Sequence, residues 1–369
     1  MNIIYWLWLA LKENISERTR IALLDKFINA KEIYNAKNFS DIHNLSEKAE
    51  NALLDKSLDI AREVKAKIEE MGGYILTIED SEYPPLLKNI YDPPYVLYMY
   101  GEHLDWRSLL TITVVGTRIP TIYGEKVTEH LARELAMSGA MIVSGMARGI
   151  DSIAGITAMK CGGKTVAVLG SGLDVVYPPE NKDLYDRISK NGVIITEYPP
   201  GTKPKRENFP RRNRIMAGLS YGILVTQAPE KSGALITASH AIENGRDLYA
   251  VPADIFDSES IGSNRLIRQG AKAVMCAEDI ISDYPYLNIV PLSEIKTEEK
   301  RRDKLKELDI SALNELQIRI VTVLNNKSMH IDEIAREIGI ANFEINSELV
   351  MLEIQGIVNK LNGNIYELI

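Results

Sequence analysis

The chain is poor in cysteine, has no long apolar run and carries no excess of positive charge. Cys161 and Cys276 are its two cysteines among 369 residues, which excludes a disulfide framework and fits a reducing compartment. The longest apolar stretch near the N-terminus runs from Ile3 to Leu11 without a basic flank. It is too short to span a bilayer and no cleavage site follows, so we expect a cytoplasmic protein with no membrane attachment.

The net charge of -8, from 43 basic and 51 acidic residues, argues against a generally basic nucleic-acid-binding protein. One segment departs from this balance. Between Gly201 and Arg214, Glu207 is the one acidic residue among six basic residues, which are Lys203, Lys205, Arg206, Arg211, Arg212 and Arg214. A short basic loop in an acidic chain indicates a local anion site.

An apolar fraction of 45% excludes a disordered chain, and 369 residues are enough for two or three domains with cores of their own. Composition and periodicity divide the chain into a small N-terminal helical domain, a central domain, a charged linker and a C-terminal domain. We expect these parts at residues 1–72, 73–285, 286–310 and 311–369.

Short amphipathic helices account for the first 72 residues. Apolar side chains recur at three- and four-residue steps, which predicts helices at Ile4–Leu11, Glu17–Phe27, Ala30–Asn35 and Glu47–Met71. The pattern is similar to SAM or helix-hairpin-helix domains, but the glycine-containing hairpin that contacts a DNA backbone is missing. We therefore expect a packing or partner-binding module, with DNA binding as the alternative.

From residue 111 onward, continuously apolar strands alternate with helices, which is typical of a parallel sheet covered on both faces. Before it, Pro84-Pro85 and Pro93-Pro94 predict a connector without helix over residues 74–101. Strands are expected at residues 111–115, 140–143, 165–169, 193–196, 222–226 and 247–251. The predicted fold class is therefore α/β, with a doubly wound sheet.

Residues 286–310 contain a balanced run of charges, which predicts a solvated linker. The last segment predicts helices at Leu313–Leu324, Ile331–Ile338 and Phe343–Gln355, then a hairpin around Asn362-Gly363, the order of a winged helix. The third helix would be the one that enters a major groove, yet it carries three glutamates and no Lys or Arg. We expect protein contact or a vestigial role for this domain.

Glycine and hydroxyl residues follow several predicted strands. They occur at Gly116-Thr117-Arg118, Ser144-Gly145, Gly170-Ser171-Gly172 and Ser232-Gly233. Because the carboxyl ends of parallel strands share one edge, these turns should converge near a topological switch point. Glycine lets backbone N–H groups approach a ligand, and the following helices present their positive N-termini. The pattern favours an anion site; the alternative is the ordinary need for glycine in such turns.

Two arginines lie in these turns. Arg118 follows the first strand and is suited to bind phosphate through two N–H groups, although an exposed loop arginine is the alternative. For Arg148, the alternative to an anion contact is an ion pair with Asp151 or Asp174.

The stretch from Asn208 to Arg214 contains the most informative cluster. Pro210 is placed to begin a helix, so the arginines that follow fall in its first turn, where cations are unfavourable by about 0.3–1 kcal/mol each. A sequence that keeps them there indicates a bound anion. Asn213 is suited to contact a base edge or the backbone, and Phe209 is expected either to stack on a base or to pack beneath the loop.

Residues for catalysis are scarce. None of the five histidines lies in a glycine-bearing turn, and the sequence has no Walker sequence, nucleophile elbow or metal-spaced cluster. Asp151 and Asp174 are expected to cap helices or fix loops. We therefore predict a binding protein rather than an enzyme, with no metal and no cofactor.

A set of motifs across residues 74–276 carries a family resemblance. The motifs are Tyr83-Pro84, Asp92-Pro93-Pro94, Val114 to Arg118, Ser144 to Asp151, Gly170 to Pro178, Glu197 to Gly201, Asn208 to Arg214, Ser232 to Thr237 and Asn264 to Ile267. Through them the chain resembles the DNA processing protein A family (DprA, also called Smf), and its flanking domains fit the longer members.

The resemblance implies an extended Rossmann-like, mostly parallel sheet that binds single-stranded DNA without sequence preference. Such proteins protect incoming strands in natural transformation and load the RecA recombinase onto them. It also implies a homodimer through the Rossmann domain, at Ile242, Asn264 and Ile267. The candidate DNA contacts are Gly116, Thr117, Arg118, Ser144, Gly145, Arg148, Gly170, Phe209, Arg211, Arg212, Asn213, Arg214 and Ser232.

Two departures and two alternative functions accompany the resemblance. Many relatives have His where this chain has Gly155, and Gly where it has Ala253. A LOG-like nucleotide phosphoribohydrolase is one alternative, but residues 231–240 lack the glycine run and carboxylate of that signature. A dinucleotide-dependent oxidoreductase is the other, but Gly170-x-Gly172 lacks the third glycine and the acidic ribose partner.

Overall fold

The computed structural model describes residues 2–43, 45–287, 289–294, 313–324, 328–361 and 363–368. The chain divides into two compact units, residues 1–289 and residues 290–369, and each is described by itself. In the described ranges, no helix has both the length and the apolar character that crossing a bilayer requires. Most of the predicted linker, residues 286–310, lies outside the described residues.

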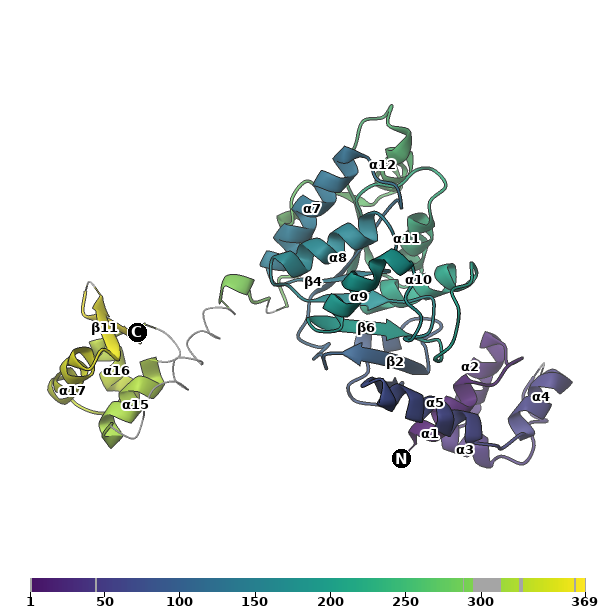
Figure 1. Cartoon of the computed structure of the whole chain (residues 1–369), viewed down its shortest axis with the longest axis horizontal. Coiled ribbons are helices and arrows are strands. Elements are labelled where there is room, and N and C mark those ends of the chain that lie inside the picture. The colour runs from purple at the N-terminus through teal and green to yellow at the C-terminus, as the bar shows by residue number, and fades with distance from the viewer. Residues whose placement is uncertain are drawn as a thin grey trace. The chain divides into compact units, whose positions relative to one another are not determined.

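The first unit is built on one mixed sheet with the strand order β1-β2-β6-β5-β4-β3-β7-β8-β9 (Figure 1). Neighbouring strands from β6 to β9 in this order are parallel, whereas β2 is antiparallel to both β6 and β1. The strands are β1 (Tyr74–Thr77), β2 (Val96–Gly101), β3 (Thr111–Val115), β4 (Met141–Ser144), β5 (Thr165–Val168), β6 (Gly192–Thr196), β7 (Gly222–Val225), β8 (Asp247–Ala250) and β9 (Lys272–Ala273). This confirms the predicted doubly wound α/β class.

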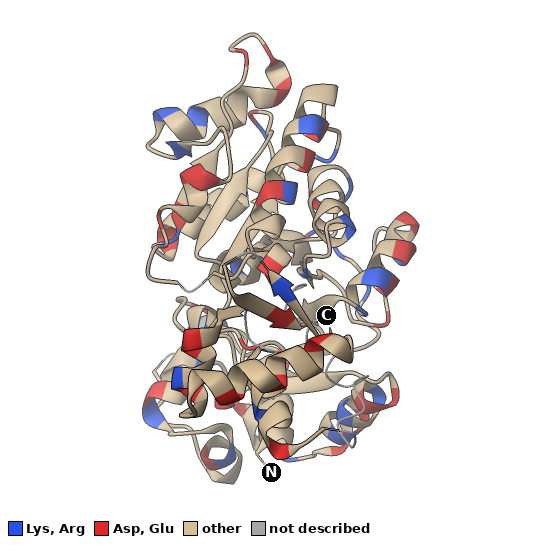
Figure 2. Cartoon of the chain, turned by 90° about the vertical axis from the view of Figure 1, so that its left-hand side faces the viewer, with Lys and Arg blue, Asp and Glu red and all other residues tan. Residues whose placement is uncertain are grey.

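Helices cover both faces of this sheet because its central strands are apolar on both sides. Val143 pairs with Val166 in the core beneath one set of helices, and Ile142 belongs to the core beneath the other. One face is covered by α7 (Ile122–Met137), α8 (Ile150–Lys160) and α9 (Lys182–Ile188); the other by α6 (Pro85–Lys88), α10 (Asn208–Leu219), α11 (Gly233–Glu243) and α12 (Ile261–Arg268). The short α13 (Glu278–Ile281) follows β9. Figure 2 shows that most charged residues lie on helices and loops. The central strands β3 to β7 contain no charged residue.

The N-terminal helices share a core with the sheet. They are α1 (Ile3–Ala10), α2 (Glu17–Lys26), α3 (Ala30–Asn35), α4 (Glu47–Leu54) and α5 (Asp59–Glu70). Trp6 and Leu7 of α1 pack in the same buried cluster as Tyr98 of β2 and Ile194 of β6. The boundary at residue 72 stays a prediction, although α5 and β1 lie on either side of it.

Two predictions about local structure are wrong. The helix expected at Glu47–Met71 is divided into α4 and α5, because Asp55 is held by distant residues: its carbonyl accepts hydrogen bonds from Trp8 Nε1 (2.9 Å) and Lys12 Nζ (2.7 Å). The expected connector over residues 74–101 contains β1, α6 and β2. Pro85 begins α6 at a position where a missing N–H costs nothing, so the prolines permit this helix.

The second unit is a winged helix in its described residues. It has α15 (Glu315–Leu324), α16 (Ile331–Ile338), α17 (Asn342–Ile354), and the strand order β10-β12-β11. The strands are β10 (Met329–His330), β11 (Val358–Leu361) and β12 (Ile365–Leu368). Its core is separate from the other clusters and includes Ile320, Leu349 and Tyr366. The predicted order of three helices and a hairpin is confirmed.

Candidate nucleic-acid interface

A cleft of about 1140 Å³ lies beyond the carboxyl ends of β3, β4 and β7. The strand order reverses between β3 and β7, so the cleft is at the topological switch point. Its lining comes from the β3–α7 loop, the β4–α8 loop, the start of α10 and the β7–α11 loop. Seven of the predicted site residues meet there: Gly116, Thr117, Arg118, Phe209, Arg212, Asn213 and Ser232.

The loop after β3 presents Arg118 to the cleft. A Cβ on Gly116 would lie 2.6 Å from the Ile150 side chain and 2.7 Å from the Gln227 carbonyl, so glycine is required by packing. The Thr117 N–H donates to that same carbonyl (2.8 Å), which fixes the backbone just before Arg118. Arg118 itself is exposed, with its guanidinium 5.7 Å from the centre of the Phe209 ring.

Two aromatic rings form part of the cleft wall. The Phe209 ring lies 5.5 Å from the ring of Tyr177, and both are half-buried. Phe209 also packs on Gly170, where a Cβ would approach the ring to 3.1 Å. The neighbouring Asn208 donates from Nδ2 to the Gly170 carbonyl (3.0 Å), which holds the start of α10 against the end of β5. Phe209 therefore both packs on the loop and faces the cleft.

Arg212 fills the space that Gly145 leaves open. A Cβ at position 145 would lie 2.3 Å from the Arg212 guanidinium. That guanidinium donates to the carbonyls of Gly145 (2.8 Å) and Val168, at the ends of β4 and β5, and to Asn213 Oδ1 (3.1 Å). Burial lowers the pKa of Arg212 to about 10, although the Asp151 carboxylate opposes this shift.

Asp151 fixes the loop between β4 and α8, as its sequence position predicts. Its carboxylate accepts the Gly145 N–H (2.9 Å), and burial raises the pKa of Asp151 despite the nearby Arg212 guanidinium. The Gly145 amide is therefore engaged within the protein. Asp174 has a similar role, because it accepts the Gly201 N–H (2.7 Å) and pairs with Lys67 (2.9 Å).

The other predicted arginines differ in their surroundings. Arg214 lies outside the cleft lining and is buried between Asp92 (2.9 Å) and Glu197 (2.6 Å). Arg211 is exposed, 4.0 Å from Glu197. Arg148 is exposed at the edge of a small neighbouring hollow, and its partner is Glu180 instead of the carboxylates considered from the sequence.

The start of α11 closes the other side of the cleft. Ser232 caps this helix, because its Oγ accepts the Ala234 N–H (3.2 Å). Asn213 donates from Nδ2 to the Gly233 carbonyl (3.4 Å), which ties α10 to α11. The buried Oγ1 of Thr237 lines the cleft and has no hydrogen-bond partner within the described residues.

Sequence reasoning missed part of this lining. The cations of the whole cleft lining are Arg118, Arg206, Arg212, Lys231 and Arg265, and its carboxylates are Asp151, Glu230 and Glu259. The sequence held a signal for two of the missed lining residues. Lys231 is next to the predicted Ser232, and Tyr177 follows the Gly170 turn. Arg265 lies in the later half of the domain, where no sequence pattern linked it to the other cations.

The remaining predicted residues lie outside the lining. Ser144 is buried at the end of β4. Ile242 on α11 is 65% exposed, and Ile267 on α12 is half-buried. Asn264 bonds Ala253 twice, accepting its N–H (3.1 Å) and donating to its carbonyl (3.0 Å). This clamp holds the turn that contains Ala253.

Comparison with known proteins decides the family. The sequence model of the DNA recombination-mediator protein A family matches residues 74–285, more than half of the chain. The chain belongs to this family. A second model, of the DprA winged helix domain, matches residues 306–364. This family's central domain therefore carries the cleft.

Several characterised members of the family are similar to this chain. The DNA processing protein DprA of Bacillus subtilis is 44% identical over 226 residues, which cover 61% of this chain and 76% of that protein. Protein Smf of Synechocystis is 36% identical over 326 residues, 81% of each chain.

Two solved structures resemble the fold. DprA from Streptococcus pneumoniae superposes with a TM-score of 0.68 at 34% identity, covering 76% of this chain and 98% of that one. DprA from Helicobacter pylori has a TM-score of 0.52 at 33% identity, covering 57% and 94%, and its structure is described as showing a single-stranded DNA binding mode.

Proposed function

We propose that this chain binds single-stranded DNA without sequence preference in the cleft at the switch point. The chain would protect such strands and deliver them to the RecA recombinase in the cytoplasm, during recombination and natural transformation. The observation that carries the proposal is the placement of an exposed arginine and an accessible aromatic pair on one wall of an open cleft. The single-stranded DNA binding mode described for the Helicobacter pylori relative supports it.

The cleft chemistry favours an unpaired strand over a duplex. Phe209 and Tyr177 offer ring faces, and stacking a base on an aromatic ring is worth about 1–3 kcal/mol whatever the base. Duplex bases are stacked on each other and cannot use such faces. Arg118, Lys231 and Arg206 supply positive charge for the phosphates along the same cleft.

The predicted site residues divide by role in this proposal. Arg118 and Phe209 contact the strand, with Arg148 and Arg211 at the rim. Thr117 and Ser232 lie beside this contact in the cleft lining and are held there by internal hydrogen bonds. Gly116, Gly145, Gly170, Ser144, Arg212, Asn213 and Arg214 position the loops, because packing or internal hydrogen bonds and ion pairs engage them. Binding changes no covalent bond, so no catalytic residue is assigned. Ile242 and Ile267 form the homodimer surface, with Asn264 supporting it.

A titration with labelled oligonucleotides tests this function. Single strands of different sequence should bind with similar affinity, and chromatography should recover them unaltered. RecA should assemble faster on a strand that the chain holds than on a strand coated by a single-strand-binding protein alone. Strong preference for one sequence, or release of free base from the nucleotide, would contradict the proposal.

A further inference from the structure

Between β8 and α12, the loop from Ala253 to Ser260 reaches the cleft lining at Glu259 and exposes two large apolar side chains outside that lining. Ile255 is 77% exposed and Phe256 is 89% exposed. The Phe256 N–H donates to Asp254 Oδ1 (2.9 Å), which closes a tight turn at the tip. An ordered loop that leaves a phenyl ring in water gains nothing from that ring during folding, so its exposure points to a contact with another molecule.

Side-chain hydrogen bonds fix both ends of this loop. At its start, Asn264 clamps Ala253 through two bonds (3.1 and 3.0 Å). At its end, Asp257 accepts hydrogen bonds from Ser260 Oγ (2.6 Å) and Gln227 Nε2 (3.2 Å). The tip is therefore held in place before any partner arrives, which lowers the entropy cost of binding.

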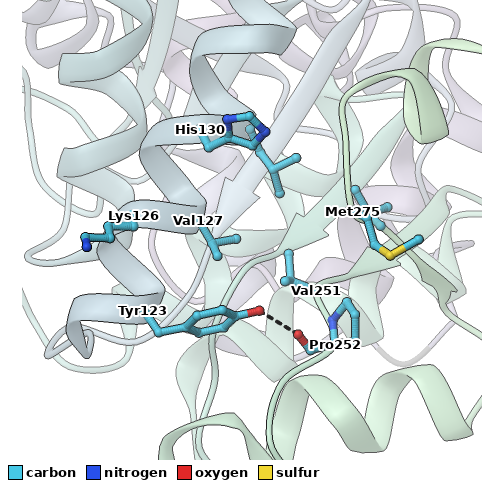
Figure 3. Close-up of a pocket in the computed structure, with 9 residues that line it drawn as sticks. Tyr123, Lys126, Val127, His130, Val251, Pro252 and Met275 are labelled. Carbon is cyan, nitrogen blue, oxygen red and sulfur yellow. Dashed lines mark hydrogen bonds between the residues drawn. The ribbon is translucent and has the colours of Figure 1, made fainter.

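An apolar hollow of about 280 Å³ lies beside the base of the loop (Figure 3). Tyr123 and Val127 of α7 form one wall, and Val251, Pro252 and Met275 lie opposite them. The Tyr123 hydroxyl donates to the Pro252 carbonyl (2.7 Å), so the wall of the hollow and the base of the loop are in contact. The volume is just below the range of about 300–1,000 Å³ that is usual for small-molecule sites, and suits one aromatic side chain.

The loop and the hollow carry complementary charge. Asp254, Asp257 and Glu259 are the charged residues from Ala253 to Ile261. The lining of the hollow includes the cation Lys126 and no carboxylate within the described residues. Asp254 and Asp257 flank the apolar tip and repel a phosphate backbone, which disfavours nucleic acid as the ligand of the tip.

We propose that Phe256 of one copy inserts into the hollow of a second copy, and that the second copy returns the same contact. Because the tip and the hollow are neighbours on one molecule, a two-fold axis between them brings each tip over the other hollow, the arrangement of an isologous interface. Exposed Ile122 and Met275 widen the apolar contact. This interface is proposed in addition to the homodimer surface at Ile242 and Ile267, which adjoins it through Asn264, and copies that use both would join into assemblies larger than dimers.

Sedimentation velocity of the full chain across a concentration range tests the contact. Phe256→Asp should weaken self-association at least tenfold and leave assemblies no larger than dimers, while Ile28→Asp, at an exposed site between α2 and α3, should change nothing. Because Phe256 is exposed, its variant should melt at the wild-type temperature. The Ile242→Asp variant should still form dimers through the hollow. The double variant, with both Ile242→Asp and Phe256→Asp, should not form them.

Cross-linking between two different variants tests the pairing directly. In a chain whose Cys161 and Cys276 are changed to Ser, a Phe256→Cys protein mixed with a Val127→Cys protein should form a disulfide-linked pair on oxidation. An Ile28→Cys protein mixed with the Val127→Cys protein should not. Cross-linking no greater than this control, together with unchanged sedimentation of Phe256→Asp, would overturn the proposal. A Phe256→Asp protein that loses oligonucleotide affinity but self-associates normally would assign the tip to DNA and equally overturn it.

Discussion

At the residue scale, Arg118 and Arg212 use the same guanidinium group for different purposes. Arg118 is exposed over the Phe209 ring, whereas Arg212 is buried and donates to carbonyls at two strand ends. An exposed arginine can neutralise a phosphate at little desolvation cost. A buried one that donates to internal acceptors holds the strands in place.

Replacing Arg118 with alanine should therefore weaken the binding of all single strands alike. We expect about a tenfold loss, about 1.4 kcal/mol, because one charge-assisted contact disappears. The slope of log affinity against log salt should become shallower by about 0.7, the value for one phosphate on a single strand. Fluorescence anisotropy at several salt concentrations measures both quantities. The control is Arg107→Ala, at an exposed site outside the cleft lining, and an unchanged slope for Arg118→Ala would remove Arg118 from the site.

Replacing Gly145 with alanine should act through Arg212. The new Cβ would lie 2.3 Å from a guanidinium that carbonyls hold on two sides, and overpacking of this kind costs about 1–3 kcal/mol. Thermal unfolding should shift to lower temperature, and DNA affinity should fall without a change in salt slope. Gly155→Ala is the matched control, because its Cβ would meet only Thr165 Oγ1 at 3.8 Å. Equal melting temperatures for the two variants would show that stability does not depend on the absence of a side chain at position 145.

The sequence predicted the positions of these residues better than their contacts. Gly145 is recognisable as part of a turn after a strand, because that pattern is local. What fills the space beside it is not recognisable, since Arg212 lies 67 residues further along the chain. The ion pair of Arg214 could not be predicted for the same reason, because its partner Asp92 is 122 residues away.

At the element scale, α10 is held in place by a buried ion-pair network. Arg214 lies between Asp92 and Glu197, and these carboxylates raise the pKa of Arg214 in spite of its burial. Arg214→Met should leave both carboxylates without their partner and destabilise the protein by about 3–5 kcal/mol. Arg211→Met, one turn of α10 earlier at an exposed position, should change stability by less than about 0.5 kcal/mol. Urea unfolding compares the two, and similar midpoints would contradict a structural role for Arg214.

The N-terminal helices should show a pH dependence of stability that comes from Lys56. Its Nζ lies 5.1 Å from the Trp8 ring and 5.2 Å from the Phe39 ring, and burial lowers the pKa of Lys56 to about 8. Between pH 8 and the ordinary value of 10.5, the unfolded chain binds more protons at this residue than the folded chain. Stability must therefore rise with pH across that window.

Urea unfolding of wild type and Lys56→Met at several pH values measures this effect. The free energy of unfolding of wild type, relative to the variant, should increase from pH 8 upward. For Lys48→Met, at an exposed site, the difference in unfolding free energy from wild type should not change with pH. If the difference in unfolding free energy between wild type and Lys56→Met is also independent of pH, this would contradict the burial of the Lys56 ammonium group.

Elements with a local signal were predicted well, and those that depend on distant partners were not. Strand β3 and helices α3 and α16 have the predicted bounds, because apolar periodicity within each segment determines them. The break between α4 and α5 was missed because Asp55 bonds Trp8, 47 residues earlier. Strand β2 was missed although its partner β1 is near in sequence; its other partner, β6, follows about a hundred residues later in the chain.

At the scale of the whole molecule, the chain divides its charge between its parts. The whole chain has an acidic excess, whereas the cleft lining holds more cations than carboxylates. Such a molecule has little attraction for duplex DNA over its general surface, and depends on the cleft for any polynucleotide it holds. The winged-helix unit fits this description, because α17 carries glutamates and no Lys or Arg.

We propose that one open cleft holds an unpaired strand through phosphate contacts and stacking. The measurement that tests it most directly is the affinity of the full chain for a labelled single strand and for its duplex, at low and at physiological salt. We predict tighter binding of the single strand at both, with a slope of log affinity on log salt near -3, from about four phosphate contacts at about -0.7 each. Equal or tighter binding of the duplex would contradict the account.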